Sequence, residues 1–355
     1  MTVTIRDVAR RADVSVATVS RVLNGKGPVL EETRKRVERV ARSLRYFPHG
    51  AARSLITRRT NTVGVLLPDI HGEFFSEVIR GIDVAARRSG YHLLVSSSHS
   101  EKTEIEAALR AMRGRVDGLI AMCPDIRARE VRRNVPEGLP VVLLNCFADG
   151  ESVDSITIDN YGGAYEMVRH LTSLGHRRIA HICGAPRNHD ARERLRGYRA
   201  GMSSFAGGPA KDLEVEGDFS DEAGYMAGRR LLASDHPPTA IFAANDSMAI
   251  GCLAALVEAG RRVPEDVALA GFDDIPVARF MTPPLTSVRV SIADLGERAL
   301  DRLLHGVSRH NRHPRRHETL PTALVVRSSC GGTFPATRSL RYRALSEKAE
   351  RRVHA

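Results

Sequence analysis

Three side chains among the first 21 residues could read the bases of DNA. Val16 and Ala17 offer only apolar contact, for instance to a thymine methyl group, whereas Arg21 can pair bidentately with guanine. Helical spacing places all three on one outward face, because Val19 and Val22 point to the opposite side. The pattern predicts a short helix whose exposed side meets a nucleic acid.

This helix is predicted to be the second of two short helices joined by a tight turn. The apolar positions of the first recur at helical spacing. They are Ile5, Val8, Ala9 and Ala12. Thr4 is a good N-cap for the first helix and Ser15 for the second, and Asn24-Gly25 ends the second. In a helix-turn-helix the second helix enters the major groove and flanking helix ends meet phosphate, which adds Thr4, Ser15 and Asn24 as DNA contacts.

A third helix is predicted from residue 31 to residue 44. Its apolar residues Val37, Val40, Ala41 and Leu44 repeat at helical spacing, and basic residues fill the other positions. Three short helices then share one small core. An ordinary three-helix packing unit with a solvated basic face is the alternative to a DNA-binding head.

Basic charge is concentrated at the two ends of the chain. Residues 1–59 hold 14 Lys and Arg against 5 Asp and Glu, a net charge of +9, and residues 331–355 hold 6 against 2, a net charge of +4. The whole chain of 355 residues carries +11, so the middle carries −2. This distribution favours a head that binds a polyanion on a near-neutral body.

The composition indicates a globular protein. A hydrophobic content of 42% is ordinary, and the chain beyond the head is long enough for one large or two medium domains. With no apolar N-terminal segment and no apolar run of about 20 residues, we expect a cytoplasmic chain with no membrane partner. The five scattered cysteines suggest neither a zinc cluster nor a disulfide framework, and several look like buried positions. No metal and no cofactor is expected.

The segment 48–62 links the head to the body. Pro48 could begin a helix of one or two turns, which is too short to be stable without DNA or a partner subunit. An exposed Leu55 on this segment is a candidate apolar wedge into the minor groove. The alternative is a flexible tether whose leucine packs on the body.

From residue 63 the pattern changes to alternating strands and helices. Strands are predicted at 63–67, 92–97, 118–121, 141–145, 179–183, 240–243 and 267–270. Helices are predicted at 74–89, 101–113, 161–174, about 191–205, 221–233 and 247–259. This alternation indicates an α/β architecture with parallel sheets in two similar halves.

Ligands in such folds bind beyond the carboxyl ends of the strands. The segments that follow strands are 68–75, 96–100, 145–147, 159–160, 184–194, 219, 245–246 and 272–274. Their aromatic side chains could stack on a ring while Asp, Asn and Arg bind its polar groups, which suits a sugar or a nucleoside. Each residue also has a structural alternative: Asn245 as an N-cap, Arg194 as a surface ion pair and Phe219 as core.

Several motifs together resemble the lactose-repressor (LacI/GalR) family of bacterial transcription regulators. The motifs are the head, the linker Ala52-Arg53-Ser54-Leu55, Gly271-Phe272-Asp273-Asp274-Ile275, Thr282-Pro283-Pro284-Leu285-Thr286 and Pro321-Thr322-Ala323-Leu324-Val325-Val326-Arg327. The match runs from about residue 2 to residue 328, and several ordered motifs at the family's spacing make it specific.

The resemblance implies a domain order. It gives a helix-turn-helix DNA-binding domain at 1–47, a hinge helix and linker at 48–62, and an effector-binding and dimerisation core at 63–330. This core would be similar to type I periplasmic binding proteins, with two subdomains joined by three crossovers. The tail, 331–355, is basic and expected to be disordered. The resemblance further implies a homodimer, or a dimer of dimers, on double-stranded DNA with a pseudopalindromic operator.

The resemblance also assigns roles to residues. Val16 and Ala17 match the base-reading pair, Thr18, Ser20 and Arg21 their supporting or base contacts, and Leu55 the minor-groove wedge. In the core, the positions that match the lining of the effector pocket are Phe74, Arg194, Phe219, Asn245 and Asp273, with Asp159 a weaker match. The effector is expected to be a sugar or a related metabolite.

The chain departs from the family pattern at several positions. His49 stands where many members have Asn, and Val290 where Gln is frequent near the pocket, so a polar ligand contact is in doubt. In the basic tail, Leu340 and Leu345 are too few for the leucine-heptad helix that makes the lactose repressor a tetramer. Effector identity and the choice between dimer and tetramer therefore stay open.

Two other classes of function compete with a DNA-binding regulator, which is expected to be a repressor. A periplasmic-type sugar-binding receptor without a DNA role would share the core, but it would need a signal peptide and would not use the head. An enzyme would need a catalytic constellation, and the sequence has no G-x-S-x-G elbow, no G-x-G-x-x-G turn after a strand, no Walker loop and no metal-ligand spacing. We expect no enzymatic activity.

Overall fold

The computed structural model describes residues 3–23, 27–46, 59–99, 101–146, 153–208, 210–308 and 316–332. The chain divides into two compact units. One comprises residues 1–62 with the short segment 115–117, and the other comprises 63–114 and 118–355. Each unit has its own hydrophobic core.

The first unit contains three helices, α1 (Ile5–Ala12), α2 (Val16–Leu23) and α3 (Glu31–Ser43). Both predicted N-caps are present. The main-chain N–H and the hydroxyl of Thr4 donate to the Asp7 carboxylate, over 2.9 and 2.7 Å, and the N–H of Thr18 donates to Ser15 Oγ over 3.1 Å. Asp13, which follows α1, adopts a left-handed conformation with φ 49° and so permits the tight turn into α2.

These helices share the core that the apolar spacing predicts. Its buried members are Val8, Ala9, Ala12, Val19, Val22, Val37 and Ala41. Leu23, Val40 and Leu44 are half-buried and pack against them. A buried face therefore fixes how α2 is rotated, and this rotation turns its other face outward.

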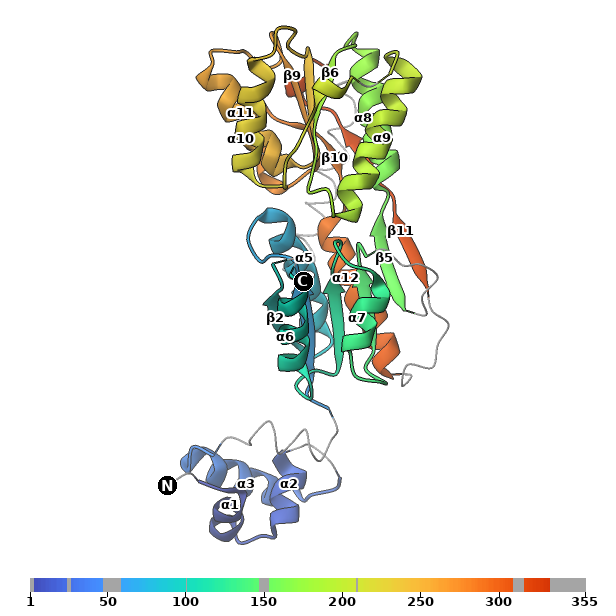
Figure 1. The fold of residues 1–355 in the computed structure, drawn as a ribbon. Helices are drawn as coiled ribbons and strands as arrows, with labels where there is room; N and C mark the ends of the chain where they lie inside the picture. The colour runs from blue at the N-terminus through green and yellow to red at the C-terminus, as the bar shows by residue number, and fades with distance from the viewer. Residues whose placement is uncertain are drawn as a thin grey trace. The chain divides into compact units, whose positions relative to one another are not determined.

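The second unit contains two six-stranded sheets, each flanked by helices (Figure 1). The strand orders are β11-β5-β4-β3-β1-β2 and β12-β10-β9-β8-β6-β7. β1 pairs with β3, and β6 pairs with β8, in parallel register. The antiparallel partner of β10 is β12. The two sheets with similar orders confirm the predicted α/β class in two similar halves.

We call the layer around the first sheet subdomain 1. Its strands are β1 (Thr62–Leu67), β2 (His92–Ser97), β3 (Gly118–Met122), β4 (Val141–Leu144), β5 (Asp154–Ile158) and β11 (His317–Leu320). Its helices are α5 (Glu73–Arg88), α6 (Lys102–Met112), α7 (Ala128–Asn134) and α12 (Ile292–Ser308). The central strands β3 and β4 are buried along their whole length, as expected of parallel strands covered on both faces.

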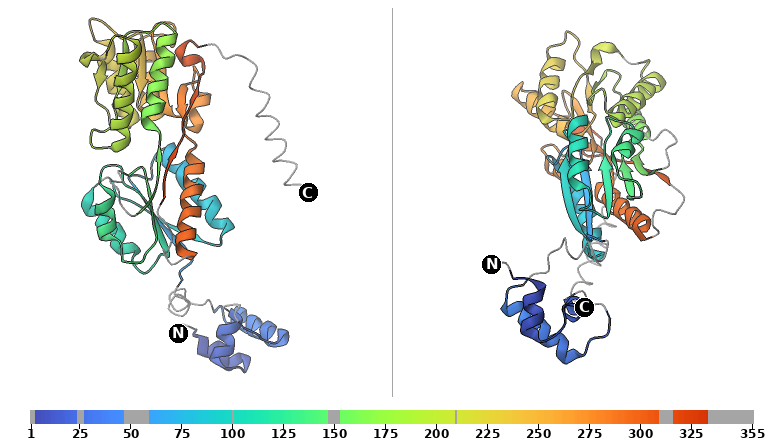
Figure 2. Two further views of the ribbon diagram at one scale, coloured as in Figure 1. Left: turned by 90° about the vertical axis from the view of Figure 1, so that its right-hand side faces the viewer. Right: turned by 60° about the horizontal axis from the view of Figure 1, so that its bottom comes forward.

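We call the layer around the second sheet subdomain 2. Its strands are β6 (Ile179–Ile182), β7 (Glu214–Val215), β8 (Ala240–Ala243), β9 (Ala268–Asp273), β10 (Thr286–Arg289) and β12 (Ala323–Val325). Its helices are α8 (Asn160–Ser173), α9 (His189–Phe205), α10 (Asp221–Leu232) and α11 (Asp246–Glu258). α8 packs beside α9, and α10 beside α11, on the two sides of the sheet (Figures 1 and 2).

Two of the helix pairs approach so closely that only glycine fits. A Cβ on Gly81 of α5 would lie 2.0 Å from the carbonyl oxygen of Ala293, next to α12's start. A Cβ on Gly251 of α11 would lie 1.8 Å from the carbonyl oxygen of Asp221 in α10. These glycines let the helix backbones touch, which fixes the helix layers over the sheets.

The chain passes between the subdomains three times, at 158–160, 289–292 and 320–323. Two main-chain groups also bridge the subdomains. The N–H of Val277 donates to Glu73 Oε2 over 3.1 Å, and the N–H of His189 donates to the carbonyl oxygen of Pro124 over 3.0 Å. The carboxyl edges of the two sheets therefore meet in this structure.

Several elements of the core lack a clear signal in the sequence or were not predicted. β5 begins with the polar pair Asp154-Ser155, so it does not look like an apolar run, although both side chains are buried. The long helix α12 was not predicted, although buried Leu295, Ala299 and Leu303 recur in it at helical spacing. α7, β7, β10, β11 and β12 are the other elements that were not predicted. Every helix within the described residues is too short or too polar to cross a bilayer.

Candidate nucleic-acid interface and ligand site

The outward face of α2 carries the predicted base-reading residues. Val16, with 42% of its surface accessible, and Ala17 and Arg21 are all exposed. An exposed valine at the start of a short helix has no packing role in this unit, so its side chain is available to a partner. Thr18 and Ser20 lie on the same helix and are half-buried.

The caps of α1 and α2 hold this face in place. Ser15 Oγ accepts from the Thr18 N–H and lies 2.9 Å from the Thr18 hydroxyl, so Ser15 and Thr18 form one polar cluster at the start of α2. Thr4 caps the start of α1, where its N–H and its hydroxyl both donate to the Asp7 carboxylate. These hydrogen bonds lower the pKa of the Asp7 carboxyl. Thr4 and Ser15 are both exposed, so a phosphate could also reach them.

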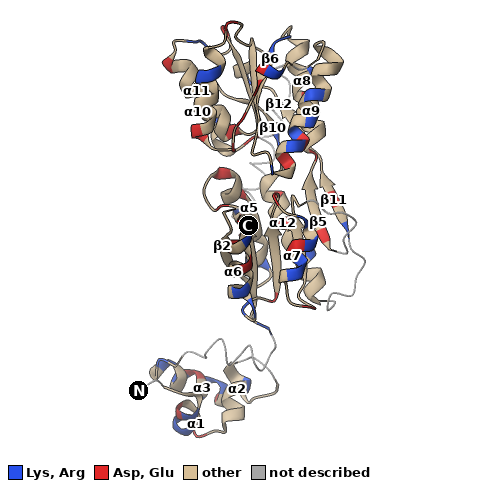
Figure 3. Ribbon diagram, in the orientation of Figure 1, with Lys and Arg blue, Asp and Glu red and all other residues tan. Residues whose placement is uncertain are grey.

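Lys and Arg positions recur along the helices of the first unit (Figure 3). On α3, Lys35, Arg36, Arg39 and Arg42 are exposed, whereas Val37 and Ala41 face the core. A solvated basic face over a small apolar core is what non-specific attraction to phosphate requires. Asn24, His49, Leu55 and the stretches 48–58 and 333–355 lie outside the described residues, so the predictions made for them stay predictions.

Arg194 of α9 is the centre of a buried polar cluster in subdomain 2. Only 3% of its surface is accessible, so the alternative of a surface ion pair is wrong. Its Nη2 lies 3.0 Å from Asp273 Oδ1, its Nε donates to Asn160 Oδ1 over 2.8 Å, and its Nη1 donates to the carbonyl oxygen of Ala244. Each guanidinium nitrogen thus has a protein acceptor.

Aromatic rings hold the guanidinium plane of Arg194. Its Cζ lies 3.8 Å from the ring centroid of Phe272 and 5.9 Å from that of Phe219. Phe219 is half-buried against the core and adopts φ 78°. A cation fixed between rings and acceptors is preorganised, because little side-chain freedom remains to be lost when a ligand binds.

Asn245 joins this cluster through the main chain. Its Oδ1 accepts from the N–H of Met248, so it is the N-cap of α11, as its structural alternative predicted. Its Nδ2 donates to the carbonyl oxygen of Phe219 over 3.0 Å. Asn245 therefore positions the Phe219 backbone in addition to starting a helix. Val290 is buried, and its N–H donates to the carbonyl oxygen of Asp273.

The predicted ligand residues Asp159 and Phe74 contact other groups than the Arg194 cluster. Asp159 is exposed and caps α8, with Oδ1 accepting from the Gly162 N–H over 2.9 Å. Phe74, in the first turn of α5, is half-buried and packs edge to face on Phe75 with 5.5 Å between centroids. Phe74 belongs to subdomain 1, so it could contribute a ring from the side opposite Phe219.

Asn160 and Asp190 belong to this cluster and were not among the predicted ligand residues, although both fall in segments that follow strands. Asn160 Nδ2 donates to Asp190 Oδ1 over 2.9 Å, while Asn160 Oδ1 accepts from Arg194. The signal that could have identified Asp190 is its position four residues before Arg194 on one helix, which puts both on one face. Nothing local to the sequence connects Asn160 with them.

Burial dominates the ionisation of the acids in this cluster. It raises the pKa of Asp190 to about 7 and that of Asp273 to about 6, although the positive charge of Arg194 opposes both shifts. Asp246, whose carboxylate accepts from Ser287 Oγ and the Ile275 N–H, also has a pKa raised well above its ordinary value by burial. At each of these three positions, the effect of burial on the pKa is therefore larger than the opposing effect of positive charge or hydrogen bonds.

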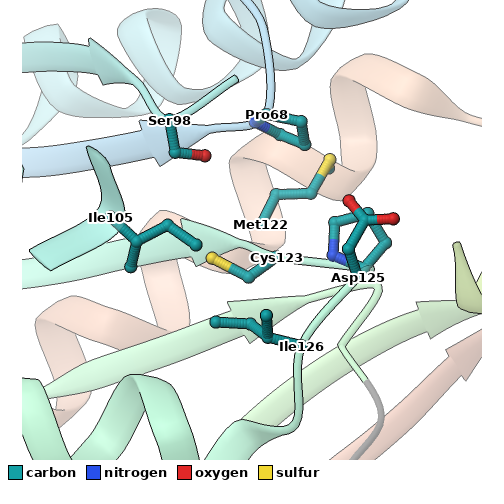
Figure 4. A pocket seen from close by; sticks show the side chains of 8 residues that line it. Pro68, Ser98, Ile105, Met122, Cys123, Asp125 and Ile126 are labelled. Carbon is teal, nitrogen blue, oxygen red and sulfur yellow. The ribbon is translucent and has the colours of Figure 1, made fainter. Parts of the chain in front are cut away.

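A shallow pocket without room for a water molecule lies at the carboxyl edge of subdomain 1 (Figure 4). Pro68 follows β1, Ser98 follows β2 and Asp125 follows β3, so the pocket marks the edge at which ligands of parallel sheets bind. Its other lining residues are Ile105, Met122, Cys123, Pro124 and Ile126. Asp125 acts electrostatically on Asp190, which connects this edge with the Arg194 cluster.

A three-helix unit with an exposed α2 face, followed by two parallel-sheet subdomains around a preorganised polar cluster, defines a DNA-binding regulator with a ligand-binding core. Comparison with known proteins agrees. Residues 4–49 match the model of bacterial regulatory proteins of the lacI family, and residues 168–330 match a periplasmic binding protein-like domain.

The chain belongs to the lacI family of bacterial regulatory proteins. It is 37% identical to the ribose operon repressor of Escherichia coli K12 over 322 residues, which cover 90% of this chain and 97% of that one. Its structure resembles the lac repressor dimer bound to operator and an anti-inducer, with a TM-score of 0.83, 30% identity and coverage of 93% and 99%. It also resembles an Enterococcus faecium family member with bound ribose, with a TM-score of 0.68, 29% identity and coverage of 76% and 98%.

Proposed function

We propose that this chain is a transcriptional repressor that binds a specific operator in double-stranded DNA and releases or tightens it in response to a small sugar-like effector. The observation that carries the proposal is the exposed face of α2 on a head that matches the lacI family. A sugar receptor without a DNA role would not use such a face, and the relatives compared above are repressors.

In the proposed head, residues 1–47, the base-reading pair is Val16 and Ala17. Arg21 pairs with guanine, and Thr18 and Ser20 support these contacts. Thr4, Ser15 and Asn24 meet phosphate at helix ends. Leu55, on the hinge within 48–62, is the proposed wedge into the minor groove.

In the proposed core, residues 63–330, the effector binds between the carboxyl edges of the two sheets. Arg194 and Asp273 contact its polar groups, Asn245 positions Phe219, and Phe219 and Phe74 stack on it from the two subdomains. Asp159 is a weaker candidate, because its exposed carboxylate already caps α8. The cluster is built for binding: Arg194 and Asp273 form a buried ion pair, which stabilises a fold poorly compared with apolar packing.

We further propose a homodimer. Large apolar side chains are exposed on both subdomains, and β2 is the outermost strand of its sheet. The exposed residues on subdomain 1 are Ile70, Val84 and Val95, and those on subdomain 2 are Leu174, Phe205, Met226, Val257 and Phe280. Burying them against a second copy would remove apolar surface from water and pair the two heads on a pseudopalindrome. Dimer or tetramer is left open, and the 331–355 tail adds only non-specific attraction to DNA.

The proposal places the protein in the cytoplasm, where DNA is, and assigns it no enzymatic activity and no cofactor. A product detected in a turnover assay with candidate sugars would contradict the expected lack of enzymatic activity. Within the described residues, no group of three or more His, Cys, Asp or Glu could hold a metal ion.

Selection of binding sites from random duplex DNA with the purified full-length protein tests the proposal. We expect a pseudopalindrome with a central CG step, enriched at both of two salt concentrations, because paired Leu55 wedges would kink the operator centre. Recovery of unrelated sequences, with binding that disappears as salt rises, would show that the head makes only electrostatic contact with DNA.

A further inference from the structure

A single carboxylate holds the end of the linker. Asp117 lies in the segment between α6 and β3 and is half-buried. Its Oδ1 accepts from the main-chain N–H of Thr60 over 2.7 Å and from the Thr60 hydroxyl over 2.8 Å. Its Oδ2 accepts from the N–H of Asn61 over 2.9 Å. Three donors of the linker therefore meet one side chain, which lies 56 residues beyond Asn61 in the sequence.

Main-chain hydrogen bonds close this arrangement. The N–H of Asp117 donates to the carbonyl oxygen of Thr62 over 2.8 Å, and the N–H of Thr62 donates to the Thr60 hydroxyl over 3.3 Å. Asn61 adopts a left-handed conformation with φ 50°, which asparagine tolerates better than most residues. The N–H groups of two successive residues, Thr60 and Asn61, thus converge on one carboxylate, as successive amides do around a bound anion.

Asp117 lies where the chain of the head continues into subdomain 1. Residues 115–117 belong to the same compact unit as the head and the linker, although the residues on both sides of this segment belong to the other unit. Thr62 begins β1 and Asp117 directly precedes β3, and these strands pair in parallel register from Val63 and Gly118. The carboxylate therefore fixes the last linker residues to the amino ends of two strands.

A carboxylate that only closes a turn has a different geometry. Asp266, shortly before β9 in subdomain 2, accepts from the N–H of Arg262 over 2.8 Å, and the two residues are four apart in the sequence. Asp117 instead joins two separate segments of the chain. Because Thr60, Asn61 and Asp117 are half-buried, water can replace their hydrogen bonds in an Asp117 variant, so the core should stay folded when the linker is released.

We propose that Asp117 is a positioning residue that couples subdomain 1 to the DNA-binding head, because it sets the direction in which the linker leaves the core. The covalent connection at Thr62 fixes only the place where the linker ends. Without the carboxylate, a rearrangement of the subdomains no longer sets the direction of the linker, and an effector no longer changes operator affinity. This inference rests on the proposed function, because it names a residue through which the effector site acts on the head.

The test measures a coupling factor in the full-length protein, defined as the ratio of operator dissociation constants with and without saturating sugar. The sugar is whichever of D-ribose, D-glucose and D-galactose raises the Tm of wild type most. We expect the factor to fall below about twofold in Asp117→Ala. Asp117→Asn should give an intermediate factor, because its amide keeps an acceptor for Thr60. Asp266→Ala is the matched control and should keep the wild-type factor.

Two results would overturn the coupling role of Asp117. One is a wild-type coupling factor in folded Asp117→Ala, or in Asp117→Asn if the alanine variant does not fold. The other is a loss of sugar affinity in the DNA-free variant that matches the loss of coupling, because this would show a general effect on the core. We expect the sugar affinity of the DNA-free variants to stay within about twofold of wild type.

Hydrogen exchange of the free protein tests the linker contact without sugar or operator. We expect the amides of Thr60 and Asn61 to exchange at least about tenfold faster in Asp117→Ala than in wild type, and to be unaffected in Asp266→Ala. Unchanged exchange at Thr60 and Asn61 in Asp117→Ala would overturn the inference even if wild type responded to no sugar. Absence of any sugar response in wild type would instead contradict the proposed function.

Discussion

At the scale of single residues, the core is notable for charges that it buries. Arg194 and Asp273 form an ion pair with 4% and 6% of their side chains accessible, and Asp190 lies four residues before Arg194. Desolvation of such groups costs several kcal/mol each, so a buried pair is weak as a source of stability. We interpret the cluster as a binding device whose polar groups were positioned before the ligand arrives.

Asp273→Asn should abolish the effector response and leave operator binding nearly unchanged. The amide keeps a hydrogen-bond acceptor for Arg194 but removes the charge that the ligand contacts. Asp273→Ala is a poorer test, because an unpaired buried guanidinium would cost about 3–5 kcal/mol of folding free energy. Operator affinity with and without a stabilising sugar is the measurement, and a response equal to that of wild type would remove Asp273 from the site.

Asp190 should make the stability of the chain depend on pH. Its pKa is about 7 in the folded chain and 3.8 in the unfolded chain, so between these values the folded state holds a proton that the unfolded state has released. Its contribution to stability therefore decreases as pH rises from about 4 to 7, by at most about 1.4 kcal/mol per pH unit. In denaturant titrations, the free energy of unfolding of wild type should therefore fall relative to that of Asp190→Asn as pH rises over this range.

His181 changes the stability with pH in the opposite direction, and the comparison of wild type with Asp190→Asn removes its contribution. Burial lowers the pKa of His181 to about 4, so this residue makes the fold less stable as pH falls from 6.5 to about 4. Because His181 is present in both proteins, it does not affect their difference. A difference between wild type and Asp190→Asn that is flat across this range would show that Asp190 is not a buried carboxyl.

At the scale of elements, packing determines which faces remain free. The buried face of α2 is fixed by Val19 and Val22, so its other face, with Arg21, is exposed. In the core, helices pair through glycines, and this leaves the carboxyl edges of the strands as the place where polar side chains converge. Position on an element thus decides which polar residue can act on a partner.

Arg21→Ala should weaken binding to the selected operator by about tenfold to a hundredfold and relax the preference for guanine at one position in each half-site. Arg36→Ala is the matched control, since Arg36 is an exposed arginine on α3 outside the proposed reading face. It should weaken binding to all sequences to a similar extent and lower the salt dependence. Equal effects of the two substitutions would contradict the reading role of α2.

Gly251→Ala should destabilise the core, although alanine normally favours a helix over glycine by about 1 kcal/mol. The new Cβ would lie 1.8 Å from the carbonyl oxygen of Asp221, so α10 and α11 would have to separate. We expect a loss of about 3 kcal/mol in a denaturant titration, as for an overpacked core. The exposed helix position Ala254, changed to Gly, should cost only about 1 kcal/mol.

Local patterns made the helix-turn-helix and most of the sheet predictable. Helical spacing fixed α1, α2 and α3, and apolar runs located β1, β2, β3, β4, β6, β8 and β9. The ligand cluster was predictable only in part, because Asn160, Asp190 and Asp273 are distant in sequence and meet around Arg194 only in the folded subdomain 2. The polar start of β5 and the caps at Asn245 and Asp159 show the same limit: a polar residue at a strand end has several roles that sequence does not distinguish.

For the whole molecule, control of DNA binding by an effector requires two arrangements of the subdomains. Contacts such as Val277 to Glu73 and His189 to Pro124 join the carboxyl edges, so a ligand held by both edges favours the arrangement in which they meet. An effector can shift operator affinity only by its difference in affinity for the two arrangements. The same factor must appear when operator changes effector affinity.

The most direct test of this account measures the affinity of full-length protein for its selected operator with and without the sugar that stabilises it most. We predict a change of about 5- to 150-fold in one direction, with little change for unrelated DNA of equal length. The reciprocal titration of sugar, with and without operator, should give the same factor. Equal operator affinity in the presence and absence of a saturating sugar would contradict the claim that this core controls the DNA-binding head.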